Sequence, residues 1–115
     1  MEKLIYTSSF GTEYEVKFEL DNYSNNGRLY VGLVCFDPEF EDWEPYGHIT
    51  TNIDFPITHK ETCGFVDINN MGEDIVKWLI DNQFARLSGN IGVSGFCEYP
   101  EMVFNIDKIK EYQYD

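Results

Sequence analysis

The chain has 115 residues, 43% of them hydrophobic and 17% aromatic, and its 21 acidic and 8 basic residues give a net charge of −13. This length predicts one domain over residues 1–115, and the apolar content excludes a disordered chain. The charge would repel nucleic-acid phosphates and anionic membranes, and no apolar run resembles a membrane span or signal peptide. We therefore expect a cytoplasmic protein whose charge attracts a basic protein partner, or serves only for solubility.

The first third of the chain predicts antiparallel strands. Residues 4–9 alternate in the manner of a short strand. From Glu13 to Leu20 apolar and charged residues alternate strictly, which is typical of a strand with one face on the core. Residues 28–36 are apolar on both faces and predict a central strand covered by a helix. Gly32 within it indicates a bulge or a close approach of that helix.

Residues 37–46, D-P-E-F-E-D-W-E-P-Y, combine acidic and aromatic residues, and five of the eight residues from position 37 to 44 are acidic. Two interpretations are open for this segment. It is an exposed contact surface, since aromatic residues are favoured at binding hot spots, or its aromatic residues fold back on the core. The candidate partner-binding residues are Asp37, Glu39, Phe40, Glu41, Asp42, Trp43 and Glu44.

The segment from residue 63 to 89 predicts a short strand, a turn and the only convincing helix, after a short strand at 49–53. The helix is expected from Met71 to Asn82, with Asn70 as its N-cap and Glu73 at the spacing of a capping box. Its apolar face repeats at helical spacing and must pack on a sheet. That face comprises Met71, Ile75, Trp78 and Leu79.

The remaining segments complete the predicted fold. The glycines and serines of residues 88–95 predict a tight, irregular return, and residues 101–106 alternate as a last strand. The tail from 107 to 115 is expected to form a short helical turn or to fray. Together these elements predict an α+β fold with a mainly antiparallel sheet of about five or six strands. The helix from Met71 to Asn82 is expected to pack on one face of that sheet.

Three cysteines are widely spaced, which does not suggest a disulfide framework. A zinc site completed by His48 or His59 is conceivable, but without a Cys-x-x-Cys pair we favour buried free thiols. We expect no catalytic residues, metal or cofactor. A possible ligand region combines turn residues with the glycine-rich return: Asp67, Asn70, Ser94, Cys97 and Tyr99.

Several short segments carry a resemblance to a known family. They are the Asp-x-Asn-Asn turn at residues 67–70 and the Ser-Gly-Phe-Cys-Glu-Tyr-Pro segment at 94–100, with similarity also in Val-Gly-Leu-Val at 31–34. The chain resembles a family of small bacterial proteins classed as a domain of unknown function, found in clostridial and related Gram-positive genomes and on their conjugative elements. The resemblance implies a mobile-element setting and supplies no catalytic residues.

Two functional hypotheses from different classes follow. The first is a non-enzymatic acidic binding protein, whose sharpest form mimics nucleic-acid charge and blocks a nucleic-acid-binding protein of host defence. The alternative is a small ligand-binding domain or enzyme that uses the Asp67/Asn70 and Ser94–Cys97 region. The first predicts carboxylates spread over a convex face, and the second predicts a concave pocket.

Overall fold

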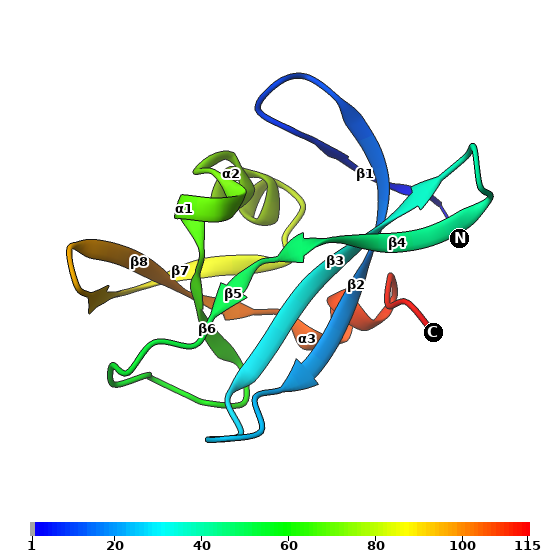
Figure 1. Ribbon diagram of the computed structural model, residues 1–115. Coiled ribbons are helices and arrows are strands. Elements are labelled where there is room, and N and C mark those ends of the chain that lie inside the picture. The colour runs from blue at the N-terminus through cyan, green and yellow to red at the C-terminus, as the bar shows by residue number, and fades with distance from the viewer. Residues whose placement is uncertain (1) are drawn as a thin grey trace.

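The chain folds as two four-stranded antiparallel sheets that share one core with a short helix (Figure 1). The computed structural model describes residues 2–115. The first sheet has the strand order β1-β2-β3-β4, with β1 at Leu4–Thr7, β2 at Glu13–Asn22, β3 at Leu29–Asp37 and β4 at Asp42–His48. The second has the order β5-β6-β8-β7, with β5 at Thr50–Thr51, β6 at Cys63–Val66, β7 at Ala85–Ser94 and β8 at Cys97–Phe104. The helices are α1 at Ile68–Met71, α2 at Asp74–Asp81 and α3 at Ile106–Lys110.

The antiparallel α+β character is confirmed, but the prediction of one sheet with one helix is wrong. The chain changes sheets at Ile49, between β4 and β5. Its N–H donates to the carbonyl of Val31 on β3, and its own carbonyl accepts from the N–H of Asp67 after β6, both at 2.8 Å. Ile49 therefore bonds to both sheets and forms the corner between them, while its side chain is fully buried.

The core lies between the inward faces of both sheets and α2. The predicted alternation in β2 is confirmed, since Val16 and Phe18 are buried. On α2, Ile75 and Leu79 are fully buried, and the ring of Trp78 packs edge-on against Tyr6 at 5.1 Å. Burying side chains of this size contributes roughly 1.5–3 kcal/mol each, so α2 is held mainly by its apolar face.

The helix is shorter than predicted and begins differently. Gly72 adopts a φ of +86°, which ends α1 and separates it from α2. The N-cap of α2 is Glu73, whose side chain makes no capping bond. The prediction of Asn70 as N-cap is therefore wrong, because Asn70 lies within α1 and turns its side chain to Asp67 instead.

Glycines account for two further differences from the sequence-based expectation. At Gly32 a Cβ would lie 2.5 Å from the hydroxyl of Tyr30, so the Tyr30 side chain rather than a helix approaches this glycine, and the bulge falls one residue later, between Leu33 and Val34. The prediction of an irregular return at residues 88–95 is wrong, since residues 85–94 form the long strand β7 with a bulge between Leu87 and Ile91.

The tail forms the expected helical turn and is not frayed. After α3, the Phe18 N–H donates to the carbonyl of Tyr112 at 2.9 Å, and the Tyr114 N–H donates to the carbonyl of Phe18 at 2.8 Å. These bonds place residues 112–114 parallel to β2. Because pairing of β1 with β2 begins at Leu4 opposite Val16, the tail occupies the edge of β2 beyond the first residue of β1.

Candidate functional site

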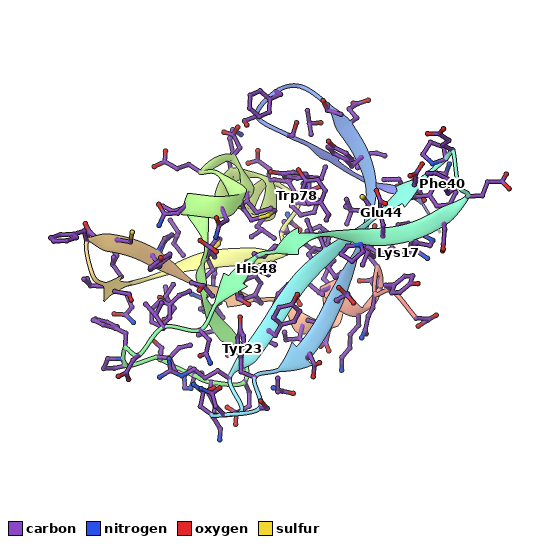
Figure 2. All side chains as sticks on the ribbon, in the orientation of Figure 1. Lys17, Tyr23, Phe40, Glu44, His48 and Trp78 are labelled. Atoms are coloured by element: carbon purple, nitrogen blue, oxygen red, sulfur yellow. The ribbon has the colours of Figure 1, made fainter. Side chains whose placement is uncertain are left out.

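The acidic hairpin, defined as residues 37–44, joins β3 to β4 and projects from the end of the first sheet (Figure 2). Asp37 and Asp42 face each other across the strands, and the turn between them is exposed. At the turn, Phe40 leaves 75% of its surface in solvent. The interpretation in which both aromatic residues fold back on the core is therefore wrong for Phe40.

Trp43 behaves differently from Phe40, because it lies on the outer face of the first sheet. Its ring packs against Phe36 with centroids 5.4 Å apart and lies 6.0 Å from Tyr114. The ammonium of Lys17 sits 4.7 Å from the centroid of the Trp43 ring. Trp43 is therefore half-buried by outer-face neighbours, and its ring already binds a cation from its own chain.

A hollow of about 490 Å³ opens at the foot of the acidic hairpin. Pairing of β2 with β3 starts at Val16 and Cys35, and beyond this point β2 follows β1 while β3 follows β4. The strands separate there and leave the hollow between them. Its lining contains one cation, Lys3, and four carboxylates: Glu13, Glu15, Asp37 and Glu44.

The field of these carboxylates acts on the buried thiol at the base of the hollow. Burial, followed by the charges of Glu44 and Asp37, raises the pKa of the Cys35 thiol. Lys3 lies 3.7 Å from Glu15 and offsets only part of the negative charge. The thiol therefore stays protonated at neutral pH, which disfavours nucleophilic chemistry, and the hollow favours a cation.

A second polar group surrounds Asp67, which is almost completely buried after β6. Its carboxylate accepts a hydrogen bond from the amide of Asn70 at 2.7 Å and lies 3.0 Å from Nε2 of His48. The His48 side chain, labelled in Figure 2, is half-exposed according to its accessible surface. The arrangement is a carboxylate that orients a solvent-facing imidazole, a geometry compatible with proton transfer as well as with a structural ion pair.

The other residues of the predicted ligand region lie on the β7–β8 hairpin. Ser94 faces Cys97 directly beside the turn, and Tyr99 lies opposite Gly92. Ser94 and Cys97 are exposed, and Tyr99 is half-buried. Within residues 2–115 no hydrogen bond joins this group to Asp67 or Asn70, so the five residues form two separate groups.

Glu101 is a buried carboxylate that the sequence-based interpretation missed. It accepts hydrogen bonds from the backbone and hydroxyl of Thr58, at 2.9 and 2.6 Å, from Ser88 at 2.6 Å and from Asn90 at 3.2 Å. Burial alone would raise its pKa, but the hydrogen bonds together lower the pKa below its usual value. The network fastens the loop after β5 to the bulge of β7.

His48 and Glu101 left different signals in the sequence. The sequence indicated His48 only as a conceivable zinc ligand, and its partner Asp67 lies nineteen residues away, between β6 and α1. Glu101 fits the alternation of the last strand, on the face opposite Met102, and a charged residue between Pro100 and Met102 was the only available signal. Its hydrogen-bond donors are scattered between residues 58 and 90, so nothing in the spacing identified them.

The cysteines are all free, but only Cys35 and Cys63 are buried, so the expectation of a buried thiol is wrong for Cys97. Cys97 is exposed because it begins β8 beside the hairpin turn. Over the described part of the chain, no three side chains of the histidine, cysteine, aspartate and glutamate types gather as metal ligands.

The fold and these sites define a small acidic α+β protein with two sheets and several exposed polar groups. The family model described as Domain of unknown function (DUF4313) matches residues 17–115, and the chain belongs to this family. The match excludes β1 and begins within β2. Neither the curated proteins nor the solved structures contain a match. No helix among residues 2–115 has the length and apolar character needed to cross a membrane.

Proposed function

We propose that this protein is a non-enzymatic binding protein whose acidic hairpin and adjoining hollow hold a basic partner protein. The observation that carries the proposal is the hollow itself, which is lined by four carboxylates at the foot of a hairpin whose turn exposes Phe40. A lysine or arginine side chain of the partner would enter the hollow, and Phe40 would pack on apolar surface next to it. Charge steering and an aromatic anchor are the two features expected of such an interface.

The outer face of the first sheet adds charge on the same side of the molecule. Glu19 adds one carboxylate to those of Glu13 and Glu15, which already line the hollow, and all three alternate with buried residues of β2 and therefore point outward. The contact between Lys17 and Trp43 supports the proposal, because it indicates that this face accommodates a cation over an aromatic ring. An arginine of the partner would make the same kind of contact.

The sharpest form of the proposal is a decoy that mimics the charge of nucleic acid. It would act in the cytoplasm of a bacterium, encoded on a mobile element, and block a nucleic-acid-binding protein of host defence. The net charge of −13 supports a partner with a strongly basic surface. The same charge disfavours direct binding of nucleic acid.

The test is capture of the partner from a host-cell extract with the folded protein as bait, followed by binding kinetics. In the charge variant, Glu39, Glu41, Asp42 and Glu44 are changed to Gln or Asn. We expect association to slow by about tenfold or more at low salt, because steering depends on exposed charges. Raising the salt should slow wild type in the same way, since screening acts beyond about 8–10 Å.

A matched control neutralises four exposed carboxylates outside the first sheet: Asp54, Glu61, Glu73 and Glu111. Both variants carry the same net charge, so a smaller effect in the control assigns the binding to the hairpin. Phe40→Ala should instead speed dissociation, with little dependence on salt. If the two charge variants associate equally fast, the hairpin is not the binding surface and the acidity serves solubility.

The His48–Asp67 pair favours a second candidate, a ligand-binding domain or enzyme centred on Asp67 and Asn70. A half-exposed imidazole held by a buried carboxylate is the one described group with geometry suited to proton transfer. Amide NMR spectra recorded with a set of small polar compounds would test it. Shifts confined to residues 47–48 and 67–71 and lost in His48→Gln would support this candidate, and unchanged spectra would exclude it for those compounds.

A further inference from the structure

The region between Asp81 and Glu98 differs in charge from the rest of the molecule. It contains no acidic residue, and Arg86 is its only charged side chain, although the chain as a whole carries a charge of −13. It also exposes apolar side chains of β7 and the hairpin turn, with Leu87, Ile91 and Val93 each about half exposed and Phe96 fully exposed. This is therefore the surface on which another acidic chain would meet the least repulsion.

The apolar side chains of β7 form one continuous stripe. Leu87, Ile91 and Val93 lie opposite Met102, Pro100 and Glu98 on β8. Residues directly opposite each other share a face, and alternate residues of one strand share a face. All three therefore lie on the face of the buried Met102, and the stripe continues the core outward along the hairpin.

β7 is also the long unprotected edge of the two sheets. β1 and β5 are edge strands of only four and two residues. β4 carries Asp42, Glu44 and Pro45, and charges and proline at an edge prevent pairing with another chain. β7 has ten residues and is protected only by its bulge at residues 88–90.

The geometry of the hairpin shows which backbone groups of β7 are free. Gly95 and Phe96 form a two-residue loop, so the flanking pair Ser94–Cys97 is the hydrogen-bonded kind. Hydrogen-bonded and non-bonded pairs alternate, so Gly92 bonds to β8 while the pairs of Ile91 and Val93 do not. Pro100, opposite Ile91, has no N–H and fits this assignment. The N–H and C=O groups of Ile91 and Val93 therefore point outward.

We propose that two copies of this chain associate by antiparallel pairing of β7 with itself, about a two-fold axis at Gly92. This register places Ile91 opposite Val93 of the second copy, with their outward backbone groups bonded to each other. The apolar stripes of both copies then lie on one face. At the axis Gly92 faces Gly92 of the second copy. A Cβ at this position would lie 2.6 Å from the Ile53 side chain of the same chain, so packing within each copy already requires a glycine here.

The charges favour a second copy of this chain as the partner that pairs with β7. A basic segment would be drawn to the acidic hairpin and hollow, and an acidic one would be repelled by the net charge. Another β7 offers an apolar strand with free edge groups and with Arg86 as its single charge. The remaining repulsion between two chains of charge −13 is long-range and screened by salt, so self-association should strengthen as salt rises.

The test is sedimentation equilibrium of the full chain over a range of concentrations and salt, with reducing agent present because Cys97 is exposed. Wild type should form a dimer whose affinity rises with salt. In Ile91→Lys/Val93→Lys, placing like charges across the axis should weaken association by at least about tenfold. The control Ile5→Lys/Phe10→Lys adds the same charge at exposed apolar residues elsewhere and should behave as wild type.

Hydrogen exchange of wild type gives a second measurement that needs no variant. The amides of Ile91 and Val93 should exchange more slowly as the protein concentration rises, while those of the β4 edge should not change. A wild type that stays monomeric at every concentration and salt would overturn the proposal. So would a dimer that the control variant weakens as much as the β7 variant does.

Discussion

The two hairpins β3–β4 and β7–β8 each expose an aromatic residue at the turn and differ in the charge around it. Each carries a phenylalanine at its turn, with Phe40 75% exposed and Phe96 fully exposed. Around Phe40 the hairpin is dense in carboxylates, whereas the sequence around Phe96 is free of them from residue 82 to 97. The same kind of exposed ring is therefore presented in opposite electrostatic settings.

The sheet edges that the two hairpins present, β4 and β7, also differ. On β4, carboxylates and Pro45 prevent an added strand and leave side chains to make contacts. On β7, free backbone groups and an apolar stripe favour an added strand. One edge suits recognition of a different, basic molecule, and the other suits recognition of a like molecule. Raising the salt concentration should therefore weaken binding of a basic molecule at the β4 edge and strengthen self-association at the β7 edge.

The largest expected effect tests whether both hairpins belong to one cooperative unit. Leu79 is fully buried between α2 and the sheets, so Leu79→Ala should cost about 2–5 kcal/mol through the cavity that remains. Denaturant unfolding followed by tryptophan fluorescence and by circular dichroism should show one common, shifted transition. A cost below about 0.5 kcal/mol, typical of surface changes, would contradict the packing described for α2.

The next largest effect should distinguish the hairpins, because it should destabilise β7–β8 more than β3–β4. Glu101→Gln replaces an oxygen that accepts hydrogen bonds with an amide that donates, which leaves a donor of Thr58, Ser88 or Asn90 without its acceptor at the buried Glu101 position. We expect a loss of about 1–3 kcal/mol, measured by denaturant unfolding, and faster hydrogen exchange in β7 than in β4. The control is Glu98→Gln on the same strand, where the side chain is exposed and stability should hardly change.

The pH dependence of thermal stability gives a second comparison of wild type with Glu101→Gln, without a denaturant series. Hydrogen bonds lower the pKa of Glu101 in the folded protein below its ordinary value of 4.5. Its contribution to stability is therefore complete above that ordinary value and is lost as the pH falls through the folded pKa. The difference in melting temperature between wild type and Glu101→Gln should shrink on acidification. A difference that stays constant down to low pH would contradict an ionised Glu101.

A smaller effect concerns the region that lies in neither hairpin. Asn70→Ala removes the amide that donates to the buried carboxylate of Asp67 and should cost about 1 kcal/mol. Asn69→Ala, at an exposed neighbouring position, is the control. Denaturant unfolding would measure both. Equal stability of the two variants would show that the Asn70 bond is dispensable for folding and would direct attention to a binding role for Asp67.

The smallest expected effect on stability is that of the acidic hairpin itself. Changing Glu39, Glu41, Asp42 and Glu44 to neutral residues should alter the free energy of unfolding by no more than about 0.5 kcal/mol, because these side chains are exposed. Relief of like-charge repulsion should give the change a stabilising sign at low salt. Thermal melts at low and high salt would measure it. A large loss of stability would show that these carboxylates have a structural role.

The sequence predicted those parts of the fold in which neighbouring residues report on their own surroundings. Strict alternation identified β2, and the spacing of Ile75, Trp78 and Leu79 identified the face of α2. It did not predict the second sheet, because the change of sheets depends on backbone bonds of Ile49 to residues 31 and 67. It did not predict β7, because glycine and serine in a bulged strand resemble a loop.

For the candidate sites, too, the sequence predicted local features and not contacts between distant segments. The acidic hairpin was visible because its residues are contiguous in the chain. The hollow beside it was not, since its lining comes from the separated ends of β2 and β3. The pairing of His48 with Asp67 and the donors around Glu101 also depend on contacts between distant segments. Local pattern therefore found the acidic hairpin and Asp67, and tertiary contacts supplied the hollow, the partner of Asp67 and the whole network of Glu101.

The bonds between Phe18 and residues 112–114 have a consequence for the time course of folding. They join segments near opposite ends of the sequence, and contacts of such separation are slow to form because much of the chain must first be ordered. During synthesis the tail could pair with β2 only after residue 114 has left the ribosome. Until then the free edge of β2 beside Phe18 would be open to pairing with another nascent chain.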